Sequence, residues 1–510
     1  MNTPKHLDQK NADESSCNSY AIRAIPPENT LLRAPARQLL LVLICLSSIC
    51  IIAMVKPFAL LDVGFTVFVL AIGLLAIYFT SMPSRQYYTG LVTSLFYFFG
   101  YAISLGAILH NKNSIPRTGF MSIGNFDFSA SEYFNVALVI FFGMSGVVLS
   151  TILAEKLFGK SFSAKDILAT TPSKKKLCLA VLAWFFMSIA IIAITSELNI
   201  GRVGLTDGSK LPFKIAGFLY YSRKITVPLL GLFFLQICVK SNFIKLTYLT
   251  LISILVIAAL GALTSLSRYL FAFTAFPPLI FLLLAQKEDK WKKSITIQYT
   301  IVCIIVGIFI FPKIQNLRNI AYQGQDIRIS RLITPPKVPP TISVPKIKIS
   351  KSPEIFFSLA TIRLTGIREL LAVTSSGVGY VKAPYDIFMG NSNLSGPICN
   401  RVFGFELHNK NGLAFGISYG LWGQLYLTKK LMCVFIGTVV LLFPSFCFEH
   451  FFASKKLTSV TLFAVLMLSF AAWSGGLSLY TLTCYSIFLF FSYIIILLLL
   501  RALNTNRISQ

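Results

Sequence analysis

Charged residues are scarce in this chain of 510 residues, and acidic residues are the scarcest of them. Asp, Glu, Lys and Arg together make up 13% of the sequence, about half of their share in an average globular domain, whereas 55% of the residues are hydrophobic. The mean hydropathy of +0.72 excludes a disordered, collagen-like or ordinary soluble protein. Because long apolar runs recur along the chain, the sequence predicts an all-α, polytopic transmembrane helix bundle.

Several motifs of known chemistry are also missing. The sequence contains no GxxxxGK[ST] phosphate loop, no zincin pattern of His and Glu, and no CxxC or Cys/His spacing among its ten cysteines. The predicted first outside loop, Lys56–Asp62, has no paired acidic residues, which argues against a metal-using lipid-phosphate sugar transferase with an acidic first loop. Few carboxylates lie within the apolar runs, which disfavours an ion-coupled transporter. We therefore expect no metal and no other cofactor.

The apolar runs that are bounded by charged or turn residues predict about twelve membrane spans. These spans are Leu39–Val55, Val63–Thr80, Tyr88–Leu109, Phe134–Leu153, Leu177–Thr195, Ile225–Val239, Leu246–Leu266, Tyr269–Ala285, Ile295–Phe311, Leu431–Phe448, Leu457–Trp473 and Leu477–Leu500. An even number of spans places both termini on the same side of the membrane.

Lysine and arginine indicate which side that is. They gather before the first span, in 156–176, in 287–293 and at Lys455 and Lys456, all on the face that carries both termini. The positive-inside rule makes this face cytoplasmic. The predicted organisation is a cytoplasmic tail over 1–38, nine spans over 39–312, one large outside segment over 313–430, three spans over 431–500 and a second cytoplasmic tail over 501–510.

The large outside segment is itself basic, although the positive-inside rule gives no reason for basic residues there. Residues 313–430 contain fifteen Lys and Arg against five Asp and Glu, a net charge of +10, within a chain whose total is +27. A basic excess of this size in a soluble protein would suggest nucleic acid. On the outer side of a membrane it predicts a different anionic partner, so we expect no nucleic acid.

Three parts of this segment differ in composition. Thr334–Pro353 is rich in proline and lysine and is expected to be extended, either as a mobile lid or as a surface excursion without a role in the chemistry. Glu354–Val373 has helical spacing, and we expect a helix on the membrane surface whose Arg363 and Arg368 reach lipid headgroups. Asp386–Gly423 is rich in Gly, Asn, Ser and aromatic residues, as a carbohydrate-binding surface or any irregular loop would be.

Two positions stand out as candidates for chemistry. His408 has Glu406 and Arg401 close by in the sequence, so it is a candidate general base, the alternative being a structural hydrogen-bonding histidine. Arg268 lies between spans seven and eight with hardly a loop to hold it. Such an arginine can extend its charge to the interface, or it can bind a phosphate with two parallel hydrogen bonds.

Short outside loops are normally poor in basic residues, but the predicted connection between spans five and six is rich in them. It contains Arg202, Lys210, Lys214, Arg223 and Lys224, and its KLPFKIAGFLYYSRK stretch is expected to lie along the interface.

Two local motifs resemble a known family. TSLSRYLFAF, which includes Arg268, resembles the Thr/Ser-x-Ser-Arg segment that opens a hydrophobic helix in bacterial O-antigen polymerases and ligases. LHNKNGLAFGISYGLWG, which includes His408, resembles the His-Asn and Gly-x-x-Gly segment after their large periplasmic loop. The predicted topology is similar too. Leu413 stands one residue late for the ligase pattern and no Glu directly precedes Gly420, which favours polymerase over ligase.

The resemblance implies a metal-independent glycosyltransferase of the bacterial inner membrane. It would join undecaprenyl-pyrophosphate-linked oligosaccharide repeat units into O-antigen or a related surface polysaccharide at the periplasmic face. The lipid-linked oligosaccharide and the lipid bilayer are the implied partners, with a chain-length regulator protein as a further one. An Arg-x10-Gly spacing discussed for such polymerases occurs at Arg368 with Gly379 and at Arg401 with Gly412.

The roles that follow are assigned to the basic residues and to His408. Arginines would neutralise the charge that develops on the leaving pyrophosphate. Our candidates for that contact are Arg268, Arg363 and Arg368, followed by Arg318, Arg328, Arg401 and Arg202. His408 is the proposed base, with Glu406 as the substitute. Two alternatives remain, which are a ligase that transfers glycan to lipid A core and a non-enzymatic polysaccharide flippase or exporter.

Overall fold

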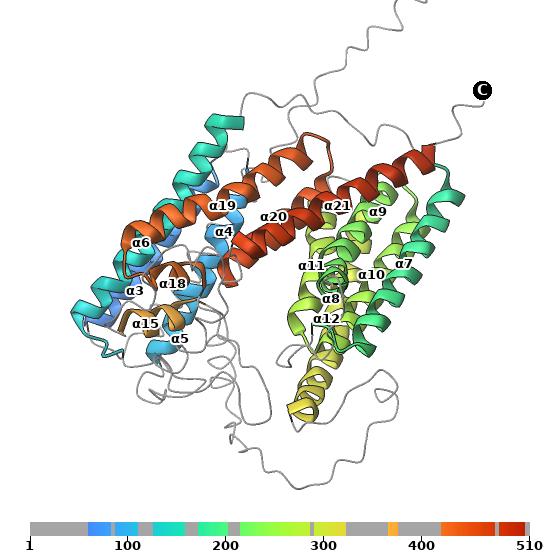
Figure 1. The fold of residues 1–510 in the computed structure, drawn as a ribbon. Coiled ribbons are helices and arrows are strands. Elements are labelled where there is room, and N and C mark those ends of the chain that lie inside the picture. The colour runs from blue at the N-terminus through green and yellow to red at the C-terminus, as the bar shows by residue number, and fades with distance from the viewer. Residues whose placement is uncertain are drawn as a thin grey trace, which may run out of the picture. The chain divides into compact units, whose positions relative to one another are not determined.

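The computed structural model describes residues 60–82, 87–110, 126–158, 172–201, 215–285, 290–322, 366–375, 420–474 and 479–504. Within these ranges every regular element is a helix, so the chain is an all-α protein, as its composition predicts. Figure 1 shows the helices in chain order from blue to red.

Ten described helices are long and apolar enough to cross a membrane. They are Leu60–Thr80 (α3), Tyr88–Gly106, Ala130–Phe158 (α6), Lys174–Glu197 (α7), Ile215–Lys240, Ile244–Ser265 (α10), Arg268–Ala285 (α11), Trp291–Arg318, Leu431–Ala453 (α19) and Thr481–Leu503. An eleventh apolar helix, α20 (Thr458–Ser474), is shorter. These eleven helices correspond to the last eleven predicted spans, and the first, Leu39–Val55, lies outside the described residues. The chain is a multi-pass membrane protein.

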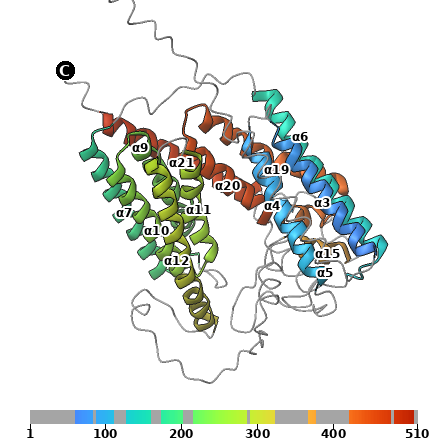
Figure 2. The same ribbon diagram turned by 180° about the vertical axis from the view of Figure 1, so that it is seen from behind.

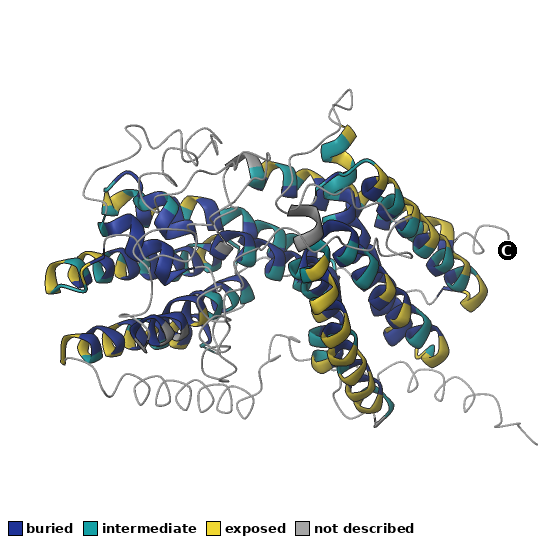
Figure 3. Cartoon of the chain, turned by 90° about the horizontal axis from the view of Figure 1, so that it is seen from below, coloured by how far each residue is buried: buried dark blue, intermediate teal, exposed yellow. Residues whose placement is uncertain are grey.

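The surfaces of the long helices are suited to a membrane. In α12 (Lys290–Tyr322) large side chains stay exposed along one side, for example Ile308 at 64% and Phe309 at 67%. Figure 3 shows the same side of α12 as a continuous yellow stripe. A soluble protein would bury such a stripe, whereas hydrocarbon solvates it without cost.

A first group of helices packs around α6 and α19. The α3 helix and the helical run Tyr88–His110 (α4, the π-helical turn η1 at Phe98–Ile103, and α5) lie against α6, and α19 lies along α6 (Figures 1 and 2). Two glycines of α6 allow close packing, Gly146 against α19 and Gly143 against Trp422. A Cβ atom on Gly143 would lie 2.3 Å from Trp422 Cε2, and one on Gly146 would lie 2.9 Å from Thr438 Cβ. Small residues at helix contacts are the usual means of close packing in membranes.

A second group is formed by α7, the run Ile215–Lys240, α10, α11 and α12. The run Ile215–Lys240 comprises α8 (Ile215–Tyr221), the π-helical turn η3 (Ser222–Thr226) and α9 (Val227–Lys240). In α9 every residue from Val227 to Val239 is buried. The α20 helix contacts α4 and α19 on one side and α9 and α11 on the other, while α21 (Leu479–Asn504) contacts α9 and η3.

Side-chain contacts show that the helix ends alternate between two faces. At one face Tyr133 OH donates to Asp62 Oδ1 at 2.5 Å, which joins the starts of α6 and α3. This face also holds the end of α12 and the start of α19, so we call it the loop face. At the opposite face Glu449 accepts hydrogen bonds from the start of α4, and Gln236 at the end of α9 contacts Ser459 at the start of α20.

Several helices extend beyond their predicted spans, two of them by ten residues or more at one end. The sixth span begins at Ile215 instead of Ile225, so Arg223 and Lys224 lie inside a helix and not in an interfacial connection. The ninth continues past Phe311 to Tyr322 and therefore includes Arg318. A hydropathy reading stops at the first charges, but a helix continues while apolar residues at helical spacing still have neighbours to pack against.

A third difference concerns the described part of the large outside segment. The helix α15 (Ile367–Ser375) was predicted to lie on the membrane surface, but Ile367 to Thr374 are all buried. It packs against α5, α6, η1 and a second short helix, α18 (Gly420–Tyr426). The surface prediction is therefore wrong for this stretch.

Candidate functional site

The π-helical turn η3 determines where Lys224 lies at the loop face. Pro228 follows this turn near the start of α9. In a regular α-helix the carbonyl group of Lys224 would accept a hydrogen bond from the backbone N–H of residue 228, but proline has no N–H. The helix accommodates this by taking one extra residue into the turn, which makes the turn π-helical. Turns of this type are frequent at functional sites.

Lys224 is surrounded by tyrosines. Its Nζ donates a hydrogen bond of 2.6 Å to Tyr485 OH on α21. The same Nζ lies 5.1 Å from the centre of the Tyr485 ring and 5.6 Å from the rings of Tyr220 and Tyr269. An ammonium ion is attracted to the faces of such rings, but rings and phenols leave its charge uncompensated. Within the described residues, these contacts of Lys224 involve no carboxylate.

Arg268 begins the helix beside this lysine. Ser267 precedes α11, and its Oγ accepts a 3.3 Å hydrogen bond from Leu270 N, as the capping residue of a helix does. This cap explains the TSLSR motif locally, because it places Arg268 in the first turn with its side chain at the loop face. Arg268 Nη2 donates to Gln315 Oε1 on α12 at 2.8 Å, and its guanidinium lies 6.0 Å from the centre of the Phe311 ring.

Arg318 reaches the same corner from α12. Its Nε donates to the carbonyl oxygen of Leu266 at 2.6 Å. Leu266 ends α10 in a left-handed conformation with φ of 55°, and a cation at a helix C-terminus stabilises its exposed carbonyl groups. Arg318 therefore also fixes the turn that presents Arg268.

Tyr269 lies between the surroundings of Lys224 and those of Arg268. It directly follows Arg268, and its ring is one of those beneath Lys224. We call Lys224, Arg268 and Arg318 the cationic cluster. All three lie at the loop face, where Lys224 contacts a tyrosine hydroxyl and Arg268 begins α11. Cations and helix N-termini are groups that bind an anion with several oxygen atoms.

Arg223, the neighbour of Lys224, has a structural role. It is 3% exposed, and its Nη1 donates to Thr195 Oγ1 at 2.9 Å while its Nη2 donates to Ile200 O at 3.3 Å. These acceptors belong to the end of α7 and the turn after it. Of the two adjacent cations, Arg223 fastens two helices together and Lys224 faces the tyrosines.

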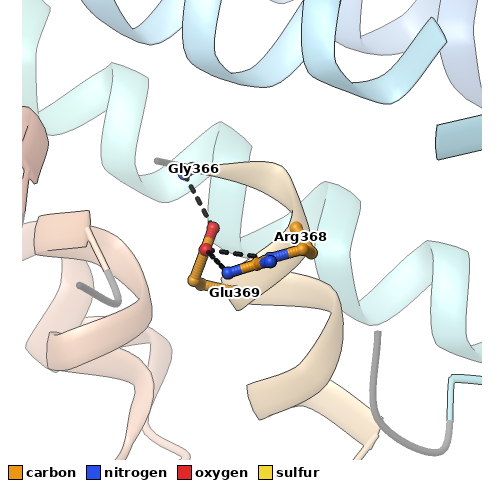
Figure 4. Close-up of polar contacts among 3 residues, drawn as sticks. All are labelled: Gly366, Arg368 and Glu369. Carbon is orange, nitrogen blue, oxygen red and sulfur yellow. Dashed lines mark hydrogen bonds and ion pairs between the residues drawn. The ribbon is translucent and has the colours of Figure 1, made fainter. Parts of the chain in front are cut away.

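Arg368 differs from the sequence-based expectation. It is 6% exposed, and its Nη2 and Nε donate to Glu369 Oε1 at 2.6 and 3.0 Å (Figure 4). The other oxygen of Glu369 accepts from the backbone N of Gly366 at 3.0 Å. The Glu369 carboxylate thus pairs the buried Arg368 charge and caps the start of α15, and Arg368 is not one of the cationic cluster.

Lys429 contacts the C-terminal end of α15. Its Nζ donates to the carbonyl oxygens of Val373 and Thr374 in the last turn of that helix. Burial lowers the pKa of the Lys429 amine to about 8, and the nearby Glu132 carboxylate opposes this shift. The amine is thus easier to deprotonate than an ordinary lysine.

The structure brings together Arg268 and Arg318 among the predicted site residues and places Arg368 elsewhere. The others, His408, Glu406, Arg363, Arg328, Arg401 and Arg202, lie outside the described residues. Sequence reasoning noted Lys224 only as one of several basic residues. Tyr220 and Lys224 are four residues apart, a helical spacing from which their contact could have been predicted. The contact of Lys224 with Tyr485 depends on the tertiary fold alone.

No family model, curated protein or solved structure matches this chain. Within the described ranges no three His, Cys, Asp or Glu side chains gather as a metal site would require.

Proposed function

We propose that this protein is a glycosyltransferase that polymerises undecaprenyl-pyrophosphate-linked oligosaccharide repeat units. The observation that carries the proposal is the cationic cluster at the loop face, in which Lys224 contacts tyrosines and Arg268 opens a helix. A diphosphate attached to a membrane lipid carries its charge at the membrane surface, where the loop face lies. The resemblance of the segments around Arg268 and His408 to O-antigen polymerases supports the same substrate.

In the proposed reaction a sugar hydroxyl of the incoming repeat unit attacks the anomeric carbon of the growing chain. The new C–O bond forms as the bond from that carbon to the phosphate oxygen breaks, and its electron pair leaves with the lipid pyrophosphate. The hydroxyl proton passes to a base, for which His408 is our candidate and Glu406 the substitute. Lys224 and Arg268, with Arg318 beside them, would stabilise the charge that the leaving group gains.

This proposal also assigns the two faces. The loop face would be periplasmic and both termini cytoplasmic, in the bacterial inner membrane, because the basic connections gather at the opposite face. The lipid-linked oligosaccharide would be the substrate, and a chain-length regulator protein a further partner.

The test uses a deletion strain complemented with variants. Lys224→Met and Arg268→Ala should each abolish long polymer while single-repeat addition and protein level stay normal. Lys240→Met is the matched control, because Lys240 ends the same helical run at the opposite face. Normal chain lengths in both cluster variants would contradict the proposal. His408→Ala should lose activity without loss of protein.

The same strain separates the alternatives. A polymerase deletion leaves core with one repeat, a ligase deletion leaves bare core with glycan retained on undecaprenyl, and a flippase deletion retains the donor at the cytoplasmic face. We expect the first pattern.

A further inference from the structure

A row of aromatic rings extends from the cationic cluster. The Tyr269 ring, 5.6 Å from Lys224 Nζ, stacks on Phe470 with 4.4 Å between ring centres. Phe470 contacts Trp473 at 5.1 Å, and Trp473 stacks on Phe96 at 5.5 Å with an angle of 13° between the ring planes. We call these four residues the aromatic row. It joins α11, α20 and α4, and so connects the two groups of helices.

The row lies at the loop-face end of the shortest described span. Phe470 and Trp473 belong to the last turn of α20, which has 17 residues. A helix of this length spans about 25 Å, less than the roughly 30 Å of the hydrocarbon core. Phe96, Tyr269 and Phe470 are only partly buried, so part of the surface of each residue is accessible.

Trp473 adds a hydrogen-bond donor to the row. The residue is 7% exposed, and among the residues that the structure describes its Nε1 has no hydrogen-bond partner. An unpaired buried donor is costly, and indole N–H groups normally find an acceptor. The donor therefore points to an occupant that brings an acceptor oxygen as well as an apolar face.

A lipid-facing aromatic belt is the ordinary explanation for such residues at a membrane boundary. Belt residues face outward, but these rings face one another between helices, and one end of the row adjoins a cation. Flat apolar faces beside an unpaired N–H suit a sugar ring, which has C–H faces and many oxygens.

We propose that the aromatic row binds the sugars that are attached to the diphosphate, with the first sugar ring near Tyr269 and Phe470 and a sugar oxygen accepting from Trp473 Nε1. This inference rests on the proposed function and deepens it. In a lipid-linked oligosaccharide the first sugar is bonded directly to the phosphate, so its subsite must adjoin the cations, as the contact between Lys224 and Tyr269 provides.

The test measures two probes on the purified full-length protein in detergent. One probe is soluble glycan, released by mild acid from the surface polysaccharide of the strain that encodes the chain, and the other is inorganic pyrophosphate. Phe470→Leu should weaken glycan binding about tenfold and leave pyrophosphate binding unchanged. Trp473→Phe, which keeps a ring but removes the donor, should weaken glycan binding several-fold. Lys224→Met should show the reverse pattern.

Phe448→Leu is the matched control, because Phe448 is a partly buried ring that stacks on Phe452 at the opposite face. Wild-type glycan affinity in Phe470→Leu would overturn the inference, and so would an equal loss in Phe448→Leu. If the row binds glycan but the wild-type protein releases no lipid pyrophosphate, the proposed function is wrong and the aromatic row remains a glycan site. If polymer forms normally in Phe470→Leu and glycan binding is unchanged, the inference about the aromatic row is wrong and the proposed function stands.

Discussion

At the scale of single residues, Lys224 shows how a cation is kept available in a membrane protein. Three tyrosine rings attract its ammonium group and the Tyr485 oxygen accepts a hydrogen bond from it, but none of them carries a full opposite charge at neutral pH. Arg223 and Arg368 illustrate the contrast, since carbonyl and carboxylate partners engage their guanidinium groups. Burial and partners, which composition does not reveal, separate the cations that contact carbonyl or carboxylate groups from Lys224.

The hydrogen bond from Lys224 to Tyr485 gives a first prediction. Tyr485→Phe keeps the ring but removes the acceptor, so Lys224 should lose its fixed position. Because hydrogen bonds to charged groups contribute about 1.5–3 kcal/mol, we expect pyrophosphate binding, measured by calorimetry, to weaken by roughly tenfold or more. Tyr493→Phe, toward the other end of α21, is the control. Equal binding by wild type and Tyr485→Phe would exclude this role.

The amine of Lys429 gives a second prediction, in terms of pH. Only the neutral amine is acylated, and with a pKa of about 8 the neutral fraction rises as the pH passes 8 and then levels off. The acylation rate of Lys429, followed by mass spectrometry of the folded protein, should therefore reach a plateau above about pH 9. A rate that keeps rising to about pH 10.4, as for an unperturbed lysine, would contradict the effect of burial.

At the scale of elements, the spans follow from the sequence but their ends do not. Long apolar runs locate eleven helices because a helix must satisfy its own backbone hydrogen bonds in hydrocarbon. The charges of Arg223 and Lys224 suggested an interfacial connection, yet tertiary partners let the helix continue through them. Likewise, pairing with Glu369 permits Arg368 to be buried, so the predicted surface helix is an internal one.

The π-helical turn before Pro228 can be tested directly. Pro228→Ala restores an N–H that can bond to the Lys224 carbonyl, which favours a regular helix without the extra residue. Since one residue corresponds to about 100° of rotation, Lys224 should turn away from Tyr485. We expect polymer formation to fall about as far as in Lys224→Met while the melting temperature stays equal or rises. Full activity in Pro228→Ala would show that the turn is dispensable.

The opposite face provides an element whose role is structural. Glu449 accepts from the backbone N of Tyr88 at 2.5 Å and of Thr89 at 2.9 Å, so this carboxylate of α19 caps α4. Glu449→Gln should lower the free energy of unfolding by about 1–3 kcal/mol, because an amide has only one acceptor oxygen for the two backbone N–H groups. Activity per folded molecule should be unchanged. A loss of activity at unchanged stability would contradict this structural role, because it would place the reaction at the opposite face and not at the loop face.

At the scale of the whole molecule, the alternation of helix ends gathers the basic residues of α8–α9, α11 and α12 at one face. The first turn of α11 supplies Arg268, the end of α12 supplies Arg318, and the turn η3 supplies Lys224. The motif at Arg268 could be recognised from the sequence. The contact between Lys224 and Tyr485 could not, because these two residues are 261 positions apart in the sequence and only the packed fold joins them.

The most direct measurement uses the purified protein in lipid vesicles with undecaprenyl-pyrophosphate-linked repeat units. The account predicts that wild-type protein forms a ladder of glycan lengths and releases one lipid pyrophosphate per bond formed, and that Lys224→Met and Arg268→Ala do neither while Lys240→Met behaves as wild type. Ladder formation and lipid pyrophosphate release at the wild-type rate in both cluster variants would contradict it.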